Sequence, residues 1–560
     1  MNIKSWVWTG VIAGFLLFSL ASTGYELSRS GDIHANRQFE LIHNFPTDYN
    51  FYLSRIREGL EGRWTVVEKY TSEPHQGSFI HGVYLLMGKA GAFARVPWWR
   101  AGDIYHVARI VLGAVLLLLT AFFCRRVFAA KGFSGIPFAF VAFLLAVTAS
   151  SWPKLIAVVN GSIVPASMAN FFSWRFGGYM AWWSVMDSLQ RITFIPHLLI
   201  GQSLIVVLVY LVTRRDFLNK SNSLVIVGLL AFLLGLVFPP GLVFVYAVMG
   251  VWVALQGKNM RQWVVPYGAI IMISAPSLVY LWLMTGMYPW KRLTEVDIIR
   301  PLPFDYIEYA KALGPMLPLG VAGSILALLY WEAAVLPAVA WVIAWMGLLG
   351  VFAFVPQQSP LRFSEMIPHV PLGILTAYLL YVLAKIIPKR IVIAGTILLI
   401  GSGVFHMYSS FLWQKDFIDH KIRATLPLVP TGSYVMYPLK DFIAAILFLE
   451  DVTGGGSVIL SETTAGNYIP AYSGNYVYAG HDNTVAFEAK REKVKEFFSG
   501  RMGRAIAERW LGETRASYVF YGPQERDDGG GADLRIPYPF LIEVYTNPSV
   551  TVYRVPDERI

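Results

Sequence analysis

The stretch FPTDYNFYLSRIREGLEGRWTVVEKYTSEPHQGSFIH, residues 45–81, decides how this chain is interpreted. It combines acids, bases, aromatic residues and histidines, and it follows a hydrophobic segment near the N-terminus. Elsewhere the chain is built largely of apolar runs. A polar segment of this length is therefore where chemistry can take place.

The composition indicates a polytopic membrane protein. Of the 560 residues, 55% are hydrophobic and only 15% are charged, and the mean hydropathy is +0.50. No ordinary water-soluble domain could bury that much apolar sequence. The net charge of +10 comes without a tract rich in Lys and Arg, which favours membrane orientation over nucleic-acid binding. The single cysteine, Cys124, excludes an intramolecular disulfide framework and a CxxC site.

About eleven apolar segments are long enough to span a bilayer. The first follows Lys4 and is predicted to be a retained helix instead of a cleaved signal peptide. The segment 153–193 is interrupted by prolines and glycines, which favours a surface or re-entrant loop. The predicted spans lie near residues 6–24, 106–123, 135–152, 194–213, 223–239, 241–256, 264–285, 315–331, 334–355, 367–384 and 391–413.

Basic residues predict the orientation of these spans, because short loops rich in Lys and Arg stay in the cytoplasm. With eleven spans, the basic loops fall on one side, from Lys4 to the loop that contains Lys389 and Arg390. The opposite side receives the long loop 25–105 and everything after residue 413. We therefore expect a cytoplasmic N-terminus and a working surface outside.

From residue 414 onward the pattern changes to short strands that alternate with amphipathic helices. This predicts a transmembrane domain over 1–413 and an extracytoplasmic α/β domain over 414–560. The segment SETTAGNYIPAYSG, residues 461–474, has the composition of a loop and is predicted to be a mobile link. Strands are expected at 432–437, 456–460, 476–479 and 517–521, helices at about 440–452 and 488–512, and a hairpin over 541–545 and 550–554.

Asp48 is the leading candidate for catalysis in the first external loop. It stands at the start of a stretch in which apolar residues recur at helical spacing. A carboxylate there is typical of helix capping, because it accepts hydrogen bonds from free backbone N–H groups. The functional alternative is a general base held at the membrane surface.

The plan of the whole chain resembles the GT-C superfamily of membrane glycosyltransferases. At motif level the resemblance depends on Phe45–Trp64, chiefly TDYNFY followed by GRW. It implies a polyprenyl-phosphate-linked sugar donor and an acidic residue of the first external loop that activates the acceptor hydroxyl, here Asp48. The commoner pattern has two neighbouring acids at this point, whereas Tyr49 follows Asp48 in this chain. This departure puts a metal-dependent mechanism in doubt.

Further along the same loop, Glu73 and His75 are predicted to bind sugar hydroxyls or to assist proton transfer, with a plain solvated loop as the alternative. Their spacing does not match a metal motif such as HExxH, so no metal site formed by the protein is predicted. The sequence does not decide whether a divalent metal takes part.

A phosphate leaving group develops negative charge, and fixed arginines outside the membrane are its natural partners. Arg362 is favoured, because its loop is short, joins two spans and also contains Glu365. Interfacial anchoring is the alternative for each arginine. His481 follows a predicted strand, where it is either a substrate contact or part of a turn. The predicted substrate-binding and phosphate-binding residues are Arg362, Arg191, Arg175, Arg300, Tyr49 and His481.

The resulting hypothesis is an inverting glycosyltransferase at the outer face of the cytoplasmic membrane. It would take one sugar from a polyprenyl-phosphate donor to a glycan, lipid or protein acceptor, with the lipid tail in a groove between spans. The alternative is a lipid or polysaccharide transporter or flippase. Carriers need ionisable groups in mid-membrane, whereas the charges of Arg109, Glu332 and Lys385 lie near the ends of the predicted spans.

Overall fold

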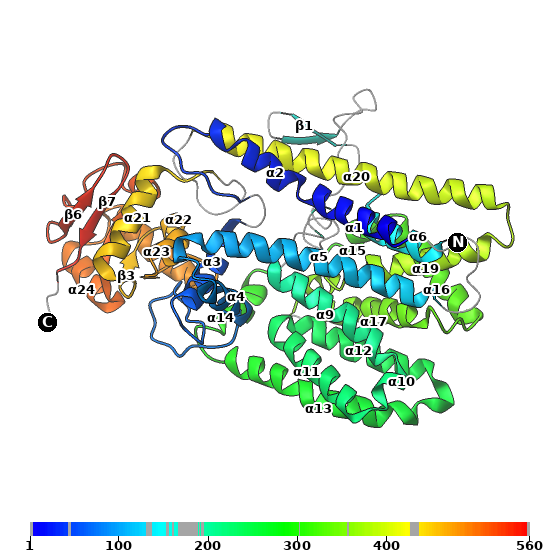
Figure 1. Cartoon of the computed structure of the whole chain (residues 1–560). Coiled ribbons are helices and arrows are strands. Elements are labelled where there is room, and N and C mark those ends of the chain that lie inside the picture. The colour runs from blue at the N-terminus through cyan, green and yellow to red at the C-terminus, as the bar shows by residue number, and fades with distance from the viewer. Residues whose placement is uncertain are drawn as a thin grey trace. The chain divides into compact units, whose positions relative to one another are not determined.

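The computed structural model describes residues 4–42, 46–129, 137–152, 156–159, 162–165, 189, 191, 195–301, 303–355, 358–425 and 436–556. The chain divides into two compact units (Figure 1). A helical unit comprises Met1–Ser22, Ala108–Trp282 and Asp297–Lys415. An α/β unit comprises Thr23–Val107, Leu283–Val296 and Asp416–Ile560. The first loop, which sequence analysis assigned to the transmembrane domain, thus packs with the C-terminal residues.

The helical unit is made of apolar helices, which satisfy their own backbone N–H and C=O groups. Three long helices, α5 (Ala101–Val127), α13 (Arg261–Met284) and α20 (Lys389–Arg423), also extend into the α/β unit. The other main helices are α1 (Ser5–Ser19), α6 (Phe138–Thr148), α9 (Pro196–Val212), α11 (Ser221–Val237), α12 (Pro239–Leu255), α16 (Met316–Leu329), α17 (Leu336–Phe352) and α19 (His369–Leu383), with short helices α10 (Arg215–Leu218), α15 (Tyr306–Leu313) and α18 (Leu361–Ser364).

Helix α19 packs closely against both α6 and α16, and glycines permit this approach. A Cβ atom on Gly323 of α16 would lie 2.1 Å from the carbonyl oxygen of Leu375 in α19. A Cβ atom on Gly373 of α19 would lie 2.8 Å from the backbone nitrogen of Ala146 in α6. Small residues at helix crossings are typical of membrane bundles, where backbones approach closely.

Each of the predicted spans falls on an apolar helix or a bent pair of helices. Among the described residues, three helices are long and apolar enough to cross a membrane, or up to five if each bent pair counts as one span. The bent pairs are α1 with α2 (Ala21–Ser28), at 45°, and α15 with α16, at 81°. The other apolar helices have 10–17 residues. The count of eleven spans therefore stays a prediction.

The α/β unit contains a five-stranded sheet with the order β4-β3-β5-β7-β6. Its first three strands, β4 (Tyr476–Val477), β3 (Val458–Leu460) and β5 (Ala516–Tyr521), are parallel. The last two, β7 (Thr551–Arg554) and β6 (Ile542–Thr546), are antiparallel to their neighbours and form the predicted hairpin. The predicted strands at 456–460, 476–479 and 517–521 are confirmed within one to two residues at their ends.

Helices pack around this sheet and complete its core. They are α21 (Lys440–Thr453), α22 (Thr463–Tyr472), α23 (Phe487–Phe498), α24 (Arg504–Thr514) and α25 (Pro523–Asp528). The central apolar cluster includes Leu460 and Val519 from the strands, Phe497 from α23, Leu511 from α24 and Tyr538. The ring of Tyr538 stacks on that of Phe497 at 4.5 Å, and its hydroxyl donates to the carbonyl of Phe497.

Two predictions for this unit are wrong. Residues 461–474 are not a mobile link, because most of them form the buried helix α22, whose first N–H, on Thr463, donates to the Glu462 carboxylate. The helix predicted over 488–512 is two helices, α23 and α24, because Gly500 adopts a φ of +69° between them. The predicted strand 432–437 lies mostly outside the described residues, as does most of 153–193, apart from the hairpin of β1 (Ile156–Val159) and β2 (Ser162–Pro165).

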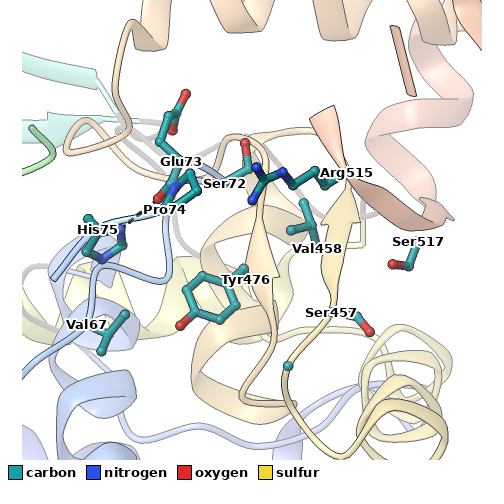
Figure 2. Close-up of a pocket in the computed structure, with 11 residues that line it drawn as sticks. Val67, Ser72, Glu73, Pro74, His75, Ser457, Val458, Tyr476, Arg515 and Ser517 are labelled. Carbon is teal, nitrogen blue, oxygen red and sulfur yellow. Dashed lines mark hydrogen bonds between the residues drawn. The ribbon is translucent and has the colours of Figure 1, made fainter. Parts of the chain in front are cut away.

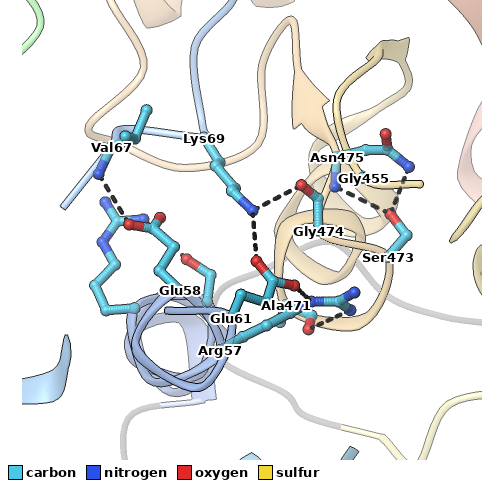
Figure 3. A network of polar contacts seen from close by, with 12 residues as sticks. Arg57, Glu58, Glu61, Val67, Lys69, Gly455, Ala471, Ser473, Gly474 and Asn475 are labelled. Atoms are coloured by element: carbon cyan, nitrogen blue, oxygen red, sulfur yellow. Dashed lines mark hydrogen bonds and ion pairs between the residues drawn. The ribbon is translucent and has the colours of Figure 1, made fainter. Parts of the chain in front are cut away.

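The first loop contains two helices, α3 (Pro46–Leu60) and α4 (Gly82–Phe93), which pack on each other, and α3 also packs on α22. Arg57 of α3 is 4% exposed and pairs with Glu61 at 2.6 Å and with Glu450 of α21 at 2.7 Å. Lys69 donates to the carbonyl of Gly474 at 2.7 Å (Figure 3). Asn50 donates to the side-chain oxygen of Asn467 in α22 at 2.9 Å.

Helices α3 and α4 cross where Gly59 and Gly88 lie against each other. A methyl group added at this crossing should therefore destabilise the fold. In Gly88→Ala, the new Cβ atom would lie 2.0 Å from the carbonyl oxygen of Ile56. We expect a loss of about 1–3 kcal/mol from overpacking, which outweighs the gain of about 1 kcal/mol in helix propensity. The measurement is the apparent melting temperature of the purified protein.

The matched control is Gly24→Ala in α2, where an added Cβ atom meets nothing within 4 Å. This variant should melt at or slightly above the temperature of the parent protein. Equal melting temperatures for the two variants would show that α3 and α4 are not in close contact.

Candidate active site

Asp48 lies in the first turn of α3, and its side chain is 36% exposed. Its Oδ1 atom lies 3.3 Å from the Nε2 atom of His481, from the other end of the sequence. The structure thus brings together two residues that sequence analysis named separately. Both belong to the α/β unit.

The imidazole of His481 is held in one orientation. Its ring stacks on Phe51 of α3, with ring centroids 4.6 Å apart and planes at 19°. Its Nδ1 atom accepts a hydrogen bond from the backbone N–H of Asn483 at 3.2 Å. Because Nδ1 accepts, the ring proton is on Nε2, and the Nε2–H group donates to the Asp48 carboxylate.

Sequence analysis missed Arg292, which anchors the turn that carries His481. Arg292 begins α14 (Arg292–Ile299), and its side chain is 2% exposed. Its Nε atom donates to the carbonyl of Asp482 at 2.8 Å, and Nη2 contacts both carboxylate oxygens of Glu488 at 2.8 and 2.9 Å. No local pattern marks a contact that joins residues 190 positions apart.

Tyr49 is buried, and its side chain turns toward α5. Its hydroxyl lies 3.3 Å from the Nε2 atom of His106, and the two rings stack at 5.6 Å. The edge of Tyr105 packs against the ring of Tyr49 at 5.1 Å. Substrate binding by Tyr49 stays a prediction.

Glu73 is part of an ion pair in the same unit. Its carboxylate contacts Nζ of Lys490 at 2.7 Å and accepts a hydrogen bond from the hydroxyl of Thr71. Burial opposes ionisation, but Lys490 and Thr71 outweigh it and hold the pKa of Glu73 below its usual value. A carboxylate with a lowered pKa is a weak base, so catalysis by Glu73 stays a prediction that its surroundings do not favour.

His75 uses both ring nitrogens to shape its own loop. Nε2 accepts from the backbone N–H of Glu68, and Nδ1 donates to the carbonyl of Glu73, each at 2.8 Å. The ring is therefore neutral, with its proton on Nδ1. The described residues show no hydrogen bond from Glu73 or His75 to Asp48, and the catalytic role of His75 stays a prediction.

The predicted phosphate-binding arginines have different surroundings. Arg191 is buried and donates to the carbonyls of Ala146, Val147 and Ala149 at 2.8–3.3 Å, which caps the C-terminus of α6. Arg362 is 40% exposed and pairs with Asp297 at 3.3 Å. Arg300 is exposed, and Arg175 lies outside the described residues. Their binding to phosphate stays a prediction.

A pair of buried acids at the sheet was also missed. Glu462 follows β3 and Glu525 follows β5, and the Glu525 carboxylate accepts from the backbone N–H of Glu462 at 2.7 Å. Burial, Asp528 and Glu525 raise the pKa of Glu462 to about 8, and burial raises that of Glu525 to about 7. A partial signal was available, because Glu462 and Glu525 lie two and four residues beyond the ends of predicted strands.

Among the described residues, no group of three or more His, Cys, Asp or Glu side chains is arranged to hold a metal ion. Asp48 and His481 are two such side chains, and we assign no chemical step to a metal.

The sequence matches no protein-family model and no curated protein. The fold is similar to ArnT from Cupriavidus metallidurans, solved bound to undecaprenyl phosphate, with a TM-score of 0.53, 11% identity and 99% of each chain covered. It is also similar to the Archaeoglobus fulgidus oligosaccharyltransferase. For the apo form the TM-score is 0.53 at 13% identity, covering 100% of this chain and 75% of that one.

A second structure of the archaeal enzyme, tethered to an acceptor peptide with the NVT sequon, gives a TM-score of 0.51 at 12% identity over 99% of this chain and 75% of that one. At these identities the likeness establishes the fold. The predicted GT-C fold is confirmed. Together with the apolar helices, it makes this chain a membrane protein.

The buried acids predict a pH dependence of stability. Unfolded glutamates titrate near 4.3, whereas Glu462 and Glu525 titrate near 8 and 7 in the folded chain. The folded state thus binds more protons, so this contribution to stability is full below about pH 4.3 and is lost as the pH rises toward 8. We expect Glu462→Gln to raise the apparent melting temperature clearly more at pH 8 than at pH 5, where the folded carboxyl still holds its proton.

The gain in the free energy of unfolding at pH 8 should be about 1–3 kcal/mol, since each pKa unit is worth about 1.4 kcal/mol. Thermal unfolding of the full chain at both pH values measures it. Glu513→Gln, an exposed glutamate of α24, is the control and should shift neither value. A similar shift for Glu462→Gln at both pH values would contradict the prediction.

Proposed function

We propose that the protein is a membrane glycosyltransferase that uses a polyprenyl-phosphate-linked sugar donor. The observation that carries this proposal is the pairing of Asp48 with His481 at 3.3 Å in a chain with the GT-C fold. The similar ArnT structure contains undecaprenyl phosphate, and a similar oligosaccharyltransferase structure carries an acceptor peptide. Both support a lipid-phosphate donor and a separate acceptor.

The proposed reaction is a single in-line displacement. The acceptor hydroxyl oxygen forms a bond to the anomeric carbon as the bond from that carbon to the phosphate oxygen breaks. The electron pair leaves with the polyprenyl phosphate, and the hydroxyl proton passes to Asp48. Attack from the face opposite the leaving group inverts the anomeric carbon.

In this mechanism Asp48 is the general base and His481 is a positioning residue. The Nε2–H of His481 donates to one carboxylate oxygen, which directs the other toward the acceptor. The exposure of the Asp48 side chain, 36%, leaves room for a hydroxyl group to approach. Stacking on Phe51 fixes the imidazole of His481, and the imidazole in turn holds the Asp48 carboxylate. The carboxylate therefore loses little conformational freedom when the acceptor binds.

The phosphate that leaves carries negative charge, which a guanidinium group can neutralise. Arg362 is the best of the proposed partners, because its side chain is 40% exposed and its ion pair with Asp297 is long, at 3.3 Å. We place the reaction at the outer face of the cytoplasmic membrane, following the distribution of basic loops.

The test is transfer from labelled polyprenyl-phosphate sugars by membranes that contain the protein. We expect Asp48→Asn to lower the rate by about 100-fold or more, because general-base catalysis contributes that much. Asp103→Asn is the matched control, since Asp103 is an acid of the first turn of α5 whose side chain is 57% exposed. Equal transfer by Asp48→Asn and the parent protein would remove Asp48 from the mechanism.

His481 gives a second, separate expectation. If it positions Asp48, His481→Ala should lower kcat by about 10-fold, and His481→Gln, which keeps a side-chain N–H donor, should recover part of the loss. Loss of acceptor binding without a change in kcat would show instead that His481 is a substrate contact. Movement of labelled lipid across the bilayer without sugar transfer would favour the transporter alternative.

A further inference from the structure

A polar cavity lies in the α/β unit, at the amino ends of the parallel strands (Figure 2). Its volume is about 420 Å³, within the range of about 300–1,000 Å³ that is typical of sites for small molecules. Its walls come from the loop of His75, from the starts of β3 and β4, and from the turn between α24 and β5. The polar side chains that line it include Ser72, His75, Ser457, Tyr476, Arg515 and Ser517.

The cavity carries one uncompensated positive charge. Its acid, Glu73, is neutralised by Lys490 at 2.7 Å, and the ring of His75 is neutral because Nε2 accepts a backbone hydrogen bond. Arg515 is exposed, and within the described ranges its guanidinium makes no hydrogen bond or ion pair. In Figure 2 this guanidinium points toward Ser72. The cavity is therefore suited to a ligand with a negative charge.

The backbone of Arg515 gives an independent indication that its side chain is used. Arg515 ends α24 in the left-handed conformation, with φ 60° and ψ 24°. Glycine is the usual residue at this position, since it has no Cβ atom to oppose a positive φ. A long charged side chain in a conformation that favours glycine is a local cost, and such costs gather at functional sites.

Three hydroxyl groups complete the lining. Within the described part of the chain, the side chains of Ser72, Ser457 and Ser517 make no hydrogen bonds, so their hydroxyls are available to a ligand. Tyr476 adds a half-buried aromatic ring. Hydroxyls, an aromatic face and an arginine match a ring that bears several hydroxyl groups and one carboxylate.

We infer that this cavity binds an acidic sugar unit, a hexuronate, of the acceptor. Arg515 would bind the carboxylate, and the three serine hydroxyls would bind the ring hydroxyls. The inference deepens the proposed function and depends on it only in identifying the ligand as part of the acceptor. Binding itself requires no transfer, so the two proposals can fail separately.

The test is calorimetric titration of the full-length protein, in a detergent without sugar groups, with digalacturonate. Its dimethyl ester is the control ligand, because it keeps both rings and loses the charges. We expect digalacturonate to bind at least about 10-fold more tightly than the ester, as one charge-assisted contact allows. Equal affinity for the two ligands, or no heat from either, would overturn the inference.

Arg515→Gly is the decisive variant, because glycine suits the backbone there and the fold should be kept or stabilised. It should weaken binding of digalacturonate by about 10-fold, whereas Arg515→Lys should keep part of the affinity. Unchanged binding by Arg515→Gly would refute this site. Failure of transfer by every form together with intact binding of digalacturonate would refute the transferase proposal alone.

Discussion

The buried ion pairs of α3 are the interaction on which the α/β unit depends. Arg57, 4% exposed, is held between Glu61 and Glu450, and Arg55, fully buried, pairs with Glu68 at 2.7 Å. A buried guanidinium that loses its partner costs about 3–5 kcal/mol, so this arrangement admits few alternatives. It fixes the helix whose first turn carries Asp48. The geometry of the proposed base is therefore set by contacts that lie outside the site itself.

The same helix joins the two features that we associate with function. Phe51 of α3 stacks on His481, and Tyr70, in the loop after α3, lies 5.5 Å from the same imidazole. Five residues beyond Tyr70, His75 lines the cavity that contains Arg515. A base and a ligand cavity that share one loop can respond together to an acceptor long enough to reach both.

Local patterns predicted much of this chain, and long-range contacts account for what they missed. The length of the apolar runs identified the apolar helices, and an aspartate beside a stretch with apolar residues at helical spacing identified Asp48. The composition of residues 461–474 concealed α22, since burial stabilises a helix that contains Gly466 and Pro470. No local sequence pattern marks Arg292 or Arg515. Arg292 matters through its contact with the distant Asp482, and Arg515 through its positive φ angle.

The discontinuity of the α/β unit has a consequence for biogenesis. Arg57 and Glu450 are 393 residues apart. At a synthesis rate of about 5–20 residues per second, the early loop must wait roughly 20–80 seconds for its partner to leave the ribosome. Throughout that interval Arg57 has its local partner Glu61 but lacks Glu450. A nascent chain of this design is exposed to misfolding and proteolysis until the segment that contains Glu450 has been made.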